Sequence, residues 1–577
     1  MTGQRHERAD TALAAAIAQH RAGNLTEAER LYRAILADHS DHTQALHLLG
    51  VLAHQCGRHA AAAELIGKAL ARDAGVPEHH ANFGLALHAL GRVREAEAAY
   101  RKALALRDAY PEAHNNLGSA LQDQGRPEEA QAHYRRALEL RGEFPEALVN
   151  LGTALRDADR PEEAAECFRR ALALDPRNPT AHSNLGVVLK ETGRADEAEA
   201  HQREALRLAP GDPETLVNLG LLREAQGRRD EAEACYRQAL ASDPGFALAR
   251  WNLALLLIGR GALAEGRELY EARFDSRRVL GARAVPVPRW QGADLTGKRI
   301  LVWREQGIGD ELLYGTCLPD LIAMAGHVVL ELDERLVPLF ARAFPQATVR
   351  AETLGPDGRE TMLPPDCDVH VPMASLPRFL RRRLSDFPPR RRYLTPDPQR
   401  FGVWRRRLAE LGPGLRIGVC WRSQRTHGER KHLYTQLDQW APVLALPGAV
   451  FVNLQYDVRD DELRHAAERL GVPLRHWPDT DLKTDLEAAA ALTANLDLVI
   501  TVQSSVGEMA GALGVPVWRF GGAYDWTMQG TACRPWFPGM RMWGAAGGES
   551  LGDVLARIAA ELRRLMAAPP AADPLRA

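Results

Sequence analysis

A helical solenoid followed by an α/β region is the fold class that this sequence of 577 residues predicts. Two observations lead to it. In the first half, small, aromatic and proline positions recur every 34 residues, which is the signature of a repeat array. In the second half this period disappears, and short apolar runs alternate with helical stretches, as is typical of parallel sheets. Because a chain of this length exceeds one cooperative core, we expect separate domains.

The composition excludes several classes of protein. The 73 Lys and Arg residues nearly cancel the 75 Asp and Glu residues, so a general nucleic-acid binder is not expected. The 7 cysteines are scattered and lack a CxxC pair, which argues against a disulfide framework and a zinc site. No apolar run reaches the roughly 18 residues that span a bilayer, and the N-terminus lacks the features of a signal peptide. We therefore expect a soluble, cytoplasmic protein with no membrane span.

The repeat array covers residues 9–280, in about eight units. Its period is marked by glycines at Gly50, Gly84, Gly118, Gly152, Gly186 and Gly220, with alanines and helix-starting prolines at the same step. The pattern resembles the tetratricopeptide repeat, in which each unit is a pair of helices. One unit cannot bury its apolar face alone, so stacked units form a superhelix with a concave groove. The aromatic and leucine positions are therefore expected in the core.

Asparagine recurs at the same step, at one position of the first helix of each pair. The residues are Asn82, Asn116, Asn150, Asn184, Asn218 and Asn252. A primary amide both donates to and accepts from a peptide bond, so this ladder could hold an extended acceptor peptide by its backbone. The arrangement resembles the asparagine ladder of the eukaryotic O-linked N-acetylglucosamine transferase. The alternative is structural, with each amide bonded to the adjacent repeat.

The α/β region begins after a linker rich in proline and glycine, 281–298. We expect a first block at 299–395, with strands in RILVWRE, HVVLELD and DVHVPM, and a linker at 396–414. A second block at 415–567 has strands in LRIGVCWR, AVFVNLQYD, LDLVITVQ and VPVWRFGG. A Pro/Arg-rich stretch, RRRLSDFPPRRRYLTPDP, interrupts the pattern. The two blocks predict two Rossmann-like halves that face a cleft, with ligands at the carboxyl ends of the strands.

The first block carries a glycine turn in LVWREQGIGDELLYG. Gly307 and Gly309 begin a G-x-G pattern, but Leu312 stands where a dinucleotide fingerprint has its third glycine, so a nicotinamide or flavin site is not expected. Asp310 is suited to be the N-cap of the next helix. The turn also resembles the G-x-G-D turn of the heptosyltransferase-like (family 9) glycosyltransferases, which implies that Asp310 is the catalytic base. Both interpretations stay open, and one residue can serve both.

The second block carries the most specific signal of the α/β region, LDLVITVQSSVGEMAGALGVPVW. It predicts a strand, a small polar turn and a helix whose N-terminus suits a phosphate. Ser504, Ser505 and the backbone near Gly507 are the expected donor contacts. Where heptosyltransferases have Asp-Thr and a later His, this chain has Gln503-Ser504 and Glu508.

Further donor contacts come from resemblance. Lys431 lies nine residues before Trp440, the spacing at which the O-linked N-acetylglucosamine transferase has a lysine on the donor diphosphate. A solvated lysine is the alternative. The stretch GGAYDWTMQGTACRPWFPGMRMW resembles the tail of bacterial repeat-glycosyltransferase fusions, which implies that Asp525 and Trp526 lie near the sugar or base. Aromatic packing is the alternative there. Gly309, Arg422, Ser423 and Gln455 are further expected donor contacts.

The resemblance as a whole implies an inverting glycosyltransferase of the two-Rossmann (GT-B) kind with a tetratricopeptide substrate-binding arm. It would move a sugar from a nucleotide-sugar to a protein Ser or Thr hydroxyl, with Asp310 as general base. No cofactor or metal is expected, since the helix dipole and the lysine charge would offset the charge of the leaving diphosphate. Bacterial enzymes of similar layout modify flagellin, so flagellin is the leading acceptor. Two alternatives stay open: a glycan or lipid-linked acceptor, and a non-catalytic scaffold with a decayed transferase half.

Overall fold

The computed structural model describes most of the chain. The described residues are 2–275, 283–353, 366–390, 392–423, 434–458, 460–471, 474–522, 525–545 and 549–567. They form two compact units, Met1–Gly227 and Arg228–Ala577. The cleft that we consider below lies entirely within the second unit.

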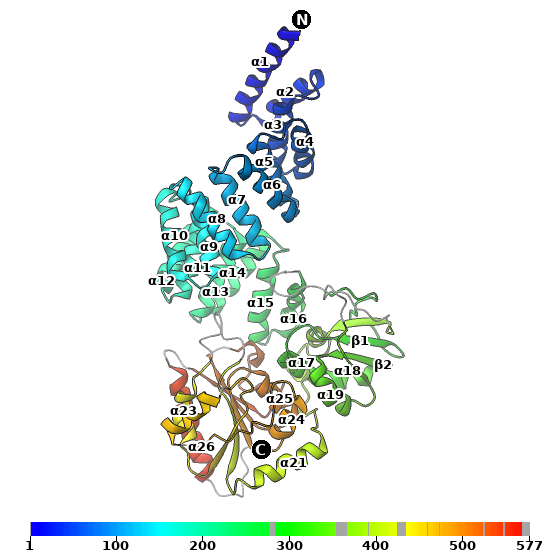
Figure 1. Ribbon diagram of the computed structural model, residues 1–577. Coiled ribbons are helices and arrows are strands. Elements are labelled where there is room, and N and C mark those ends of the chain that lie inside the picture. The colour runs from blue at the N-terminus through cyan, green and yellow to red at the C-terminus, as the bar shows by residue number, and fades with distance from the viewer. Residues whose placement is uncertain are drawn as a thin grey trace. The chain divides into compact units, whose positions relative to one another are not determined.

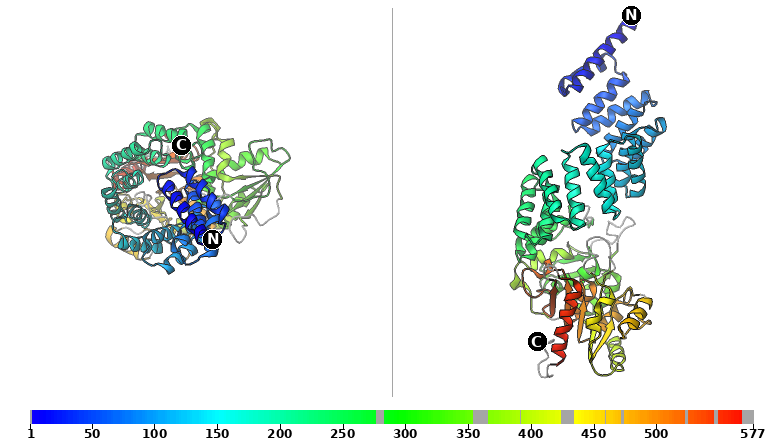
Figure 2. Two further views of the ribbon diagram at one scale, coloured as in Figure 1. Left: turned by 90° about the horizontal axis from the view of Figure 1, so that it is seen from above. Right: turned by 90° about the vertical axis from the view of Figure 1, so that its left-hand side faces the viewer.

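The first unit is a stack of antiparallel helix pairs, and successive pairs turn about a common axis (Figures 1 and 2). Its helices are α1 (Thr2–Arg21), α2 (Leu25–Asp38), α3 (Thr43–Gln55), α4 (His59–Arg72), α5 (Pro77–Ala89), α6 (Val93–Leu106), α7 (Pro111–Asp123), α8 (Pro127–Leu140), α9 (Pro145–Asp157), α10 (Pro161–Leu174), α11 (Pro179–Glu191), α12 (Ala195–Leu208) and α13 (Pro213–Ala225). The prediction of paired helices in this part of the chain is confirmed.

The repeated glycines are explained by the crossing of the two helices in a pair. A Cβ atom on Gly118 would lie 2.6 Å from the ring of Tyr134, and one on Gly152 would lie 2.6 Å from the ring of Phe168. No side chain fits at that distance, so glycine lets a fully buried ring pack directly on the helix backbone. The period of 34 residues thus records one packing contact repeated along the stack.

The second unit starts with the last helices of the repeat pattern. These are α14 (Arg229–Ser242), α15 (Ala247–Gly259), α16 (Leu263–Leu269) and the short 3-10 helix η1 (Tyr270–Phe274). Ala254, Ile258 and Leu263 are buried in one apolar core with residues of both α/β halves. The structural boundary at 227/228 therefore precedes the end of the repeat pattern at 280, because the last repeats pack into the α/β region.

A buried ion pair fixes η1 to the first α/β half. Arg273 is fully buried, and its Nε donates to Glu305 Oε2 at 2.6 Å. Glu305 follows the first strand of the sheet, two residues before Gly307 of the glycine turn. The same guanidinium contacts Glu271 and Ser375. The end of the repeat array is therefore held against the loop that carries Asp310.

The first half has a four-stranded sheet of order β3-β2-β1-β4, and all pairs are parallel. Its strands are β1 (Arg299–Trp303), β2 (His327–Leu332), β3 (Thr348–Ala351) and β4 (Val369–Pro372), and its helices are α17 (Ile308–Tyr314), α18 (Leu318–Met324), α19 (Val337–Ala343) and α20 (Leu376–Leu380), with the 3-10 turns η2 (Gly315–Cys317), η3 (Glu334–Leu336), η4 (Met373–Ser375) and η5 (Leu384–Asp386). The strand order reverses beside β1, which places a ligand crevice at the β1–α17 loop.

The second half has a five-stranded parallel sheet of order β6-β5-β7-β8-β9. Its strands are β5 (Leu415–Cys420), β6 (Ala449–Asn453), β7 (Leu498–Thr501), β8 (Val517–Gly521) and β9 (Met540–Gly544), and its helices are α22 (Ala441–Leu444), α23 (Asp460–Leu470), α24 (Leu486–Thr493), α25 (Ser505–Leu513) and α26 (Leu551–Ala567), with η7 (Leu437–Trp440) and η8 (Trp526–Met528). Helix α21 (Pro398–Ala409) connects the halves. The order reverses between β5 and β7, so the crevice of this half lies at their carboxyl ends.

The predicted strands and their parallel pairing are confirmed, but two edge strands were missed. β3 has only four residues, none of them buried, and β9 follows a loop rich in glycine and proline. Edge strands this short and this exposed lack the apolar run that identifies a strand in sequence.

Candidate functional site

A cleft of about 920 Å³ opens between the two α/β halves. It is lined by the β1–α17 turn, the β7–α25 turn, the loop before α24, η8 and two side chains of α15. The reversal points of both sheets therefore open into one cavity. This is the position at which open α/β sheets bind ligands.

Asp310 lies in this cleft, half-buried, in the first turn of α17. The N-cap of α17 is Gly307, so the interpretation of Asp310 as an N-cap is wrong. The buried Tyr270 lines the same cleft. Burial is the main reason why the pKa of Tyr270 is raised to about 12, and the charge of Asp310 adds to that shift. A carboxylate at this place can accept a proton from a bound hydroxyl group.

Gly309 brings the turns of the two halves together. A Cβ atom on Gly309 would lie 3.6 Å from Cα of Ser505 and 3.8 Å from Cγ of Glu508. Helix α17 thus packs against the N-terminus of α25, with glycine at the contact. Gly309 lines the cleft, and its predicted contact with the donor stays a prediction. The predicted base and the predicted phosphate-binding turn consequently line the same cavity.

The serines of the β7–α25 turn differ in accessibility. Ser504 is the N-cap residue of α25, and its hydroxyl lies 2.9 Å from Thr501 Oγ1. Ser505 is half-buried at the first helical position, and both serines line the cleft. Gly507 does not face the cleft: its N–H donates to the Ser504 carbonyl, and a Cβ atom there would lie 3.0 Å from Thr501. Gly507 therefore lets α25 pack on the sheet rather than contacting a donor.

A buried charge network lies beneath the turn. Arg534 Nη1 donates to both oxygens of Glu508, at 2.8 and 2.7 Å, and Arg519 bridges Glu508 to Asp525. Burial works to raise the pKa of Asp525, but Arg519, Arg534 and hydrogen bonds from Thr527 together hold that pKa below its usual value. Asp525 is thus committed to this network and does not line the cleft, whereas Trp526 does.

Two further predicted contacts are structural. The Arg422 guanidinium pairs with Glu462 and Asp457, and the buried Gln455 accepts hydrogen bonds from the backbone N–H groups of Trp421 and Arg422. Neither side chain lines the cleft, and the cleft residues nearby in sequence are instead Ser423 and Tyr456. The prediction for Arg422 and Gln455 failed because the sequence locates the end of a strand but not the direction of each side chain that follows it.

Lys431 lies outside the described residues. Among the described residues the cleft has other cations that sequence reasoning missed, namely Arg304, Arg335, Arg534 and Lys483. Arg304 pairs with Glu311, Arg335 with Asp333 and Arg534 with Glu508. Lys483 is exposed, and its charge contributes to the lowered pKa of Asp481. The motif DLKTDLE, a lysine just before a helix, is the only sequence signal for it.

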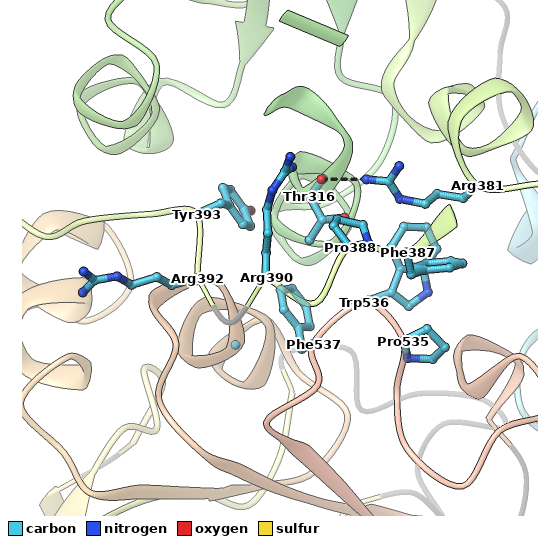
Figure 3. A pocket seen from close by; sticks show the side chains of 11 residues that line it. Thr316, Arg381, Phe387, Pro388, Arg390, Arg392, Tyr393, Pro535, Trp536 and Phe537 are labelled. Atoms are coloured by element: carbon cyan, nitrogen blue, oxygen red, sulfur yellow. Dashed lines mark hydrogen bonds between the residues drawn. The ribbon is translucent and has the colours of Figure 1, made fainter. Parts of the chain in front are cut away.

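A smaller cavity of about 20 Å³ lies at the Pro/Arg-rich stretch (Figure 3). Arg381 donates to the Thr316 carbonyl, and both Arg381 and Arg390 pair with Asp320, while Arg392 points away from them in the view shown. Two of the arginines are thus tied to the first half. In the next few residues, the N–H groups of Tyr393 and Leu394 donate to the Ala512 carbonyl of α25. The stretch therefore fastens the halves to each other.

The described residues include no group of three or more His, Cys, Asp or Glu side chains arranged to hold a metal ion. None of the described helices is both long and apolar enough to cross a membrane.

Comparison with protein families gives matches in the helical part of the chain. Models described as tetratricopeptide repeat match residues 6–77, 110–177, 149–213 and 217–276, and a TPR repeat model matches residues 84–125. The helical part is a tetratricopeptide-repeat solenoid. The last match reaches residue 276, so α15, α16 and η1 of the second unit belong to the tetratricopeptide array.

The chain is similar to one curated protein and to several solved structures of repeat proteins. Protein FlbA of Caulobacter vibrioides is 39% identical over 290 residues, which cover 48% of this chain and 49% of FlbA. This chain thus spans about half the length of the curated relative that it matches. Among solved structures, YrrB, a TPR protein with an unusual peptide-binding site, is 25% identical and covers 32% of this chain and 96% of its own, with a TM-score of 0.27. MamA is 28% identical, with coverages of 28% and 94% and a TM-score of 0.25.

The six asparagines of the tetratricopeptide array are half-buried, and four of them bond to the preceding repeat. Asn82 Nδ2 lies 2.9 Å from His47 Nε2, Asn150 donates to Asn115 at 2.9 Å, Asn184 donates to Thr153 at 3.4 Å and Asn218 donates to Ser183 at 3.3 Å. Asn252 donates to the Leu248 carbonyl, and Asn116 accepts from Asn115. These hydrogen bonds support the alternative that the asparagines have a structural role. An amide has a second N–H and a carbonyl oxygen, so these bonds leave capacity for a bound peptide.

Proposed function

We propose that this protein is a glycosyltransferase of the GT-B kind, which transfers a sugar from a nucleotide-sugar to a hydroxyl group of a protein held by the tetratricopeptide groove. The observation that carries the proposal is the single cleft in which Asp310 of the first half and the N-terminus of α25 of the second half meet, with Gly309 against Ser505. Both turns lie at the reversal points of parallel sheets.

The residues have complementary roles in a single displacement. The acceptor oxygen attacks the anomeric carbon, the bond from that carbon to the donor phosphate breaks, and Asp310 takes the hydroxyl proton. The leaving phosphate departs with the electron pair and carries new negative charge. Ser504 and Ser505 at the N-terminus of α25 and the side chain of Lys483 line the cleft. In this proposal, the helix N-terminus and the ammonium group stabilise that charge. Lys431 remains a proposed second cation.

The acceptor in this proposal is a protein Ser or Thr, with flagellin as the leading candidate because enzymes of similar layout modify it. The tetratricopeptide array supports a protein partner. The departures at Gln503 and Glu508 favour a decayed scaffold as the alternative. Against that alternative, Glu508 is built into a complete buried network with Arg534 and Arg519, which is an ordered feature of the cleft.

The test combines ligand binding with turnover. Thermal shift with UDP-, GDP-, ADP-, TDP- and CMP-sugars should stabilise the wild type with one nucleotide class, by roughly 2.7 kcal/mol at about 100 times the dissociation constant. Asp310→Asn should keep this shift but lower sugar transfer by roughly 10²–10⁴-fold, the usual contribution of a general base. The exposed Glu334, outside the cleft, provides the control Glu334→Gln, which should leave both unchanged. No shift with any donor would favour the scaffold, and full turnover by Asp310→Asn would remove that residue as the base.

A further inference from the structure

The last tetratricopeptide repeat departs from its own pattern where it meets the cleft. Trp251 of α15 lines the cleft and is half-buried. The residues at the same repeat position in earlier units are Ala81, Asn115, Val149, Ser183 and Val217, and all of them are buried. These small or medium side chains serve packing within the solenoid. Trp251 is the one residue at this repeat position that lines the cleft, and it has the largest side chain. We therefore infer that it has a role other than packing within the solenoid.

A second departure reorients the aromatic residue of that repeat. Tyr270 occupies the position of Tyr100, Tyr134 and Phe168, whose rings pack against glycines of the preceding helix. In the last repeat that glycine position is Ala254. A Cβ atom at the earlier glycines would lie 2.5–2.6 Å from the ring, so the usual contact cannot form. The ring of Tyr270 instead stacks on Trp251, with 4.9 Å between the ring centres.

Three rings consequently form a row along one wall of the cleft. Tyr270 also lies 6.2 Å from the ring of Trp526, with the planes tilted by 36°. The two outer rings, Trp251 and Trp526, are half-buried, while Tyr270 between them is buried. Leu255, one helical turn after Trp251, extends the apolar wall.

The row is fixed rigidly to the cleft. Gly261, at the end of α15, and Gly530, after η8, have positive φ angles and let the two backbones touch. A Cβ atom on Gly261 would lie 3.0 Å from the Gln529 carbonyl oxygen, and one on Gly530 would lie 2.8 Å from the Arg260 carbonyl oxygen. Arg273 adds the buried ion pair with Glu305. The wall therefore keeps its position relative to Asp310.

We propose that Trp251, Tyr270 and Trp526 form an aromatic platform that stacks on the ring of the transferred sugar, and that Trp251 is a residue of the tetratricopeptide array that determines which sugar is used. The inference rests on the proposed function. Flat aromatic faces bind the C–H faces of sugar rings, and such walls with a few polar groups opposite are typical of ligand sites. Asp310 and Tyr270 line the same cleft, and the charge of Asp310 contributes to the raised pKa of the Tyr270 hydroxyl, so the platform adjoins the proposed base, where the sugar must lie. Ser423, Tyr456 and Lys483 line the rest of the cleft and suit the nucleotide.

The test compares a nucleotide-sugar with its free nucleotide on the full chain. Using the donor found by thermal shift, Trp251→Ala should weaken binding of the nucleotide-sugar roughly tenfold, the loss of one stacking contact. Binding of the nucleoside phosphate without the sugar should stay unchanged. Trp251→Phe keeps a ring and should restore most of the affinity. The control is Trp477→Ala, a half-buried tryptophan that packs on Trp404 outside the cleft.

The outcomes separate this inference from the proposed function. If Trp251→Ala weakens the binding of the nucleotide and of the nucleotide-sugar equally, the nucleobase rather than the sugar contacts the platform. That result would overturn the inference, while the transferase proposal would stand. Unchanged binding of both would overturn it in the same way. Absence of any nucleotide-sugar binding by the wild type would refute the proposed function, and the platform with it.

Discussion

Neighbouring acids in the glycine turn show how differently two adjacent residues are used. Asp310 is half-buried and lines the cleft. Glu311 is only 2% exposed and faces inward, where Oε2 accepts a hydrogen bond from the Asp333 N–H at 2.9 Å and Oε1 lies 2.9 Å from Arg304 Nε. Burial raises the pKa of Glu311 to about 7, and these two contacts offset the shift only in part. Sequence cannot distinguish the two carboxylates, because the distinction arises from which face of α17 meets the sheet.

The raised pKa of Glu311 predicts a pH dependence of stability. Between the ordinary carboxyl pKa of 4.5 and about 7 the folded protein binds a proton that the unfolded chain has released. Stability should therefore fall as pH rises through that window. Glu311→Gln should remove this fall and be roughly 2–3 kcal/mol more stable than the wild type at pH 8, since Arg304 still has Asp333 and Glu352 nearby. Urea unfolding at about pH 5 and pH 8 measures the effect.

The control for that measurement is Glu334→Gln, which changes an exposed carboxyl to an amide outside the cleft. It should follow the wild type at both pH values. If Glu311→Gln shows the same fall in stability as the wild type, the proton is bound elsewhere and the assignment to Glu311 is wrong.

At the level of the helices and strands, the sequence located most of the candidate site because the motifs lie at element ends. Asp310, Ser504 and Ser505 belong to strand–turn–helix patterns that the sequence predicts at the carboxyl ends of strands, and all three line the cleft. Gly507 does not line it, because its neighbours in space, Thr501 among them, decide that it serves packing. Of the aromatic wall, only Trp526 was predicted near the donor. Trp251 and Tyr270 were missed, because they come from α15 and η1 and share no local pattern with η8.

Removal of asparagine side chains tests whether the ladder stabilises the array, binds the acceptor protein, or does both. The triple variant Asn150→Ala, Asn184→Ala and Asn218→Ala removes three hydrogen bonds between repeats. At about 1 kcal/mol for each neutral bond it should destabilise the array by roughly 2–4 kcal/mol. It should also weaken binding of the acceptor protein, measured by calorimetry with flagellin, while donor hydrolysis is spared. The corresponding aspartate variant keeps a carboxylate oxygen that can accept from a peptide and serves as the comparison. Lower stability with unchanged acceptor affinity would make the ladder purely structural.

For the whole molecule, the division into two units differs from the division by repeats. The second unit begins at Arg228, and its core includes Ala254, Ile258 and Tyr270 of the tetratricopeptide array. In the proposed enzyme, the last repeat would be part of the catalytic unit. A truncation at the end of the repeat pattern would therefore remove a part of that unit. Such a cut would also break the buried ion pair of Arg273 and Glu305. Without Arg273, the buried carboxylate of Glu305 loses its charged partner, which is strongly destabilising.

Two truncations test this division. A fragment of residues 228–577 should unfold in one cooperative transition and keep the donor-induced thermal shift. A fragment of residues 281–577 lacks Arg273, Tyr270 and Trp251 and should be destabilised by at least about 3–5 kcal/mol, the usual cost of breaking a buried ion pair, or fail to fold. Circular dichroism melts and the donor thermal shift provide the measurements. Equal stability of the two fragments would show that the last repeat is a separate module.

The sequence by itself determined the tetratricopeptide array, the parallel α/β halves and the two turns that face the cleft. These features depend on local periodicity and on residues that begin or end an element, and such signals are contained within a few dozen residues. Only the tertiary structure decided that Asp525, Arg422 and Gln455 are held in structural contacts, and that Trp251 and Tyr270 of the last repeat line the cleft. The direction of a side chain and the partner of a charge depend on packing against residues far away in the chain, and no local pattern encodes that packing.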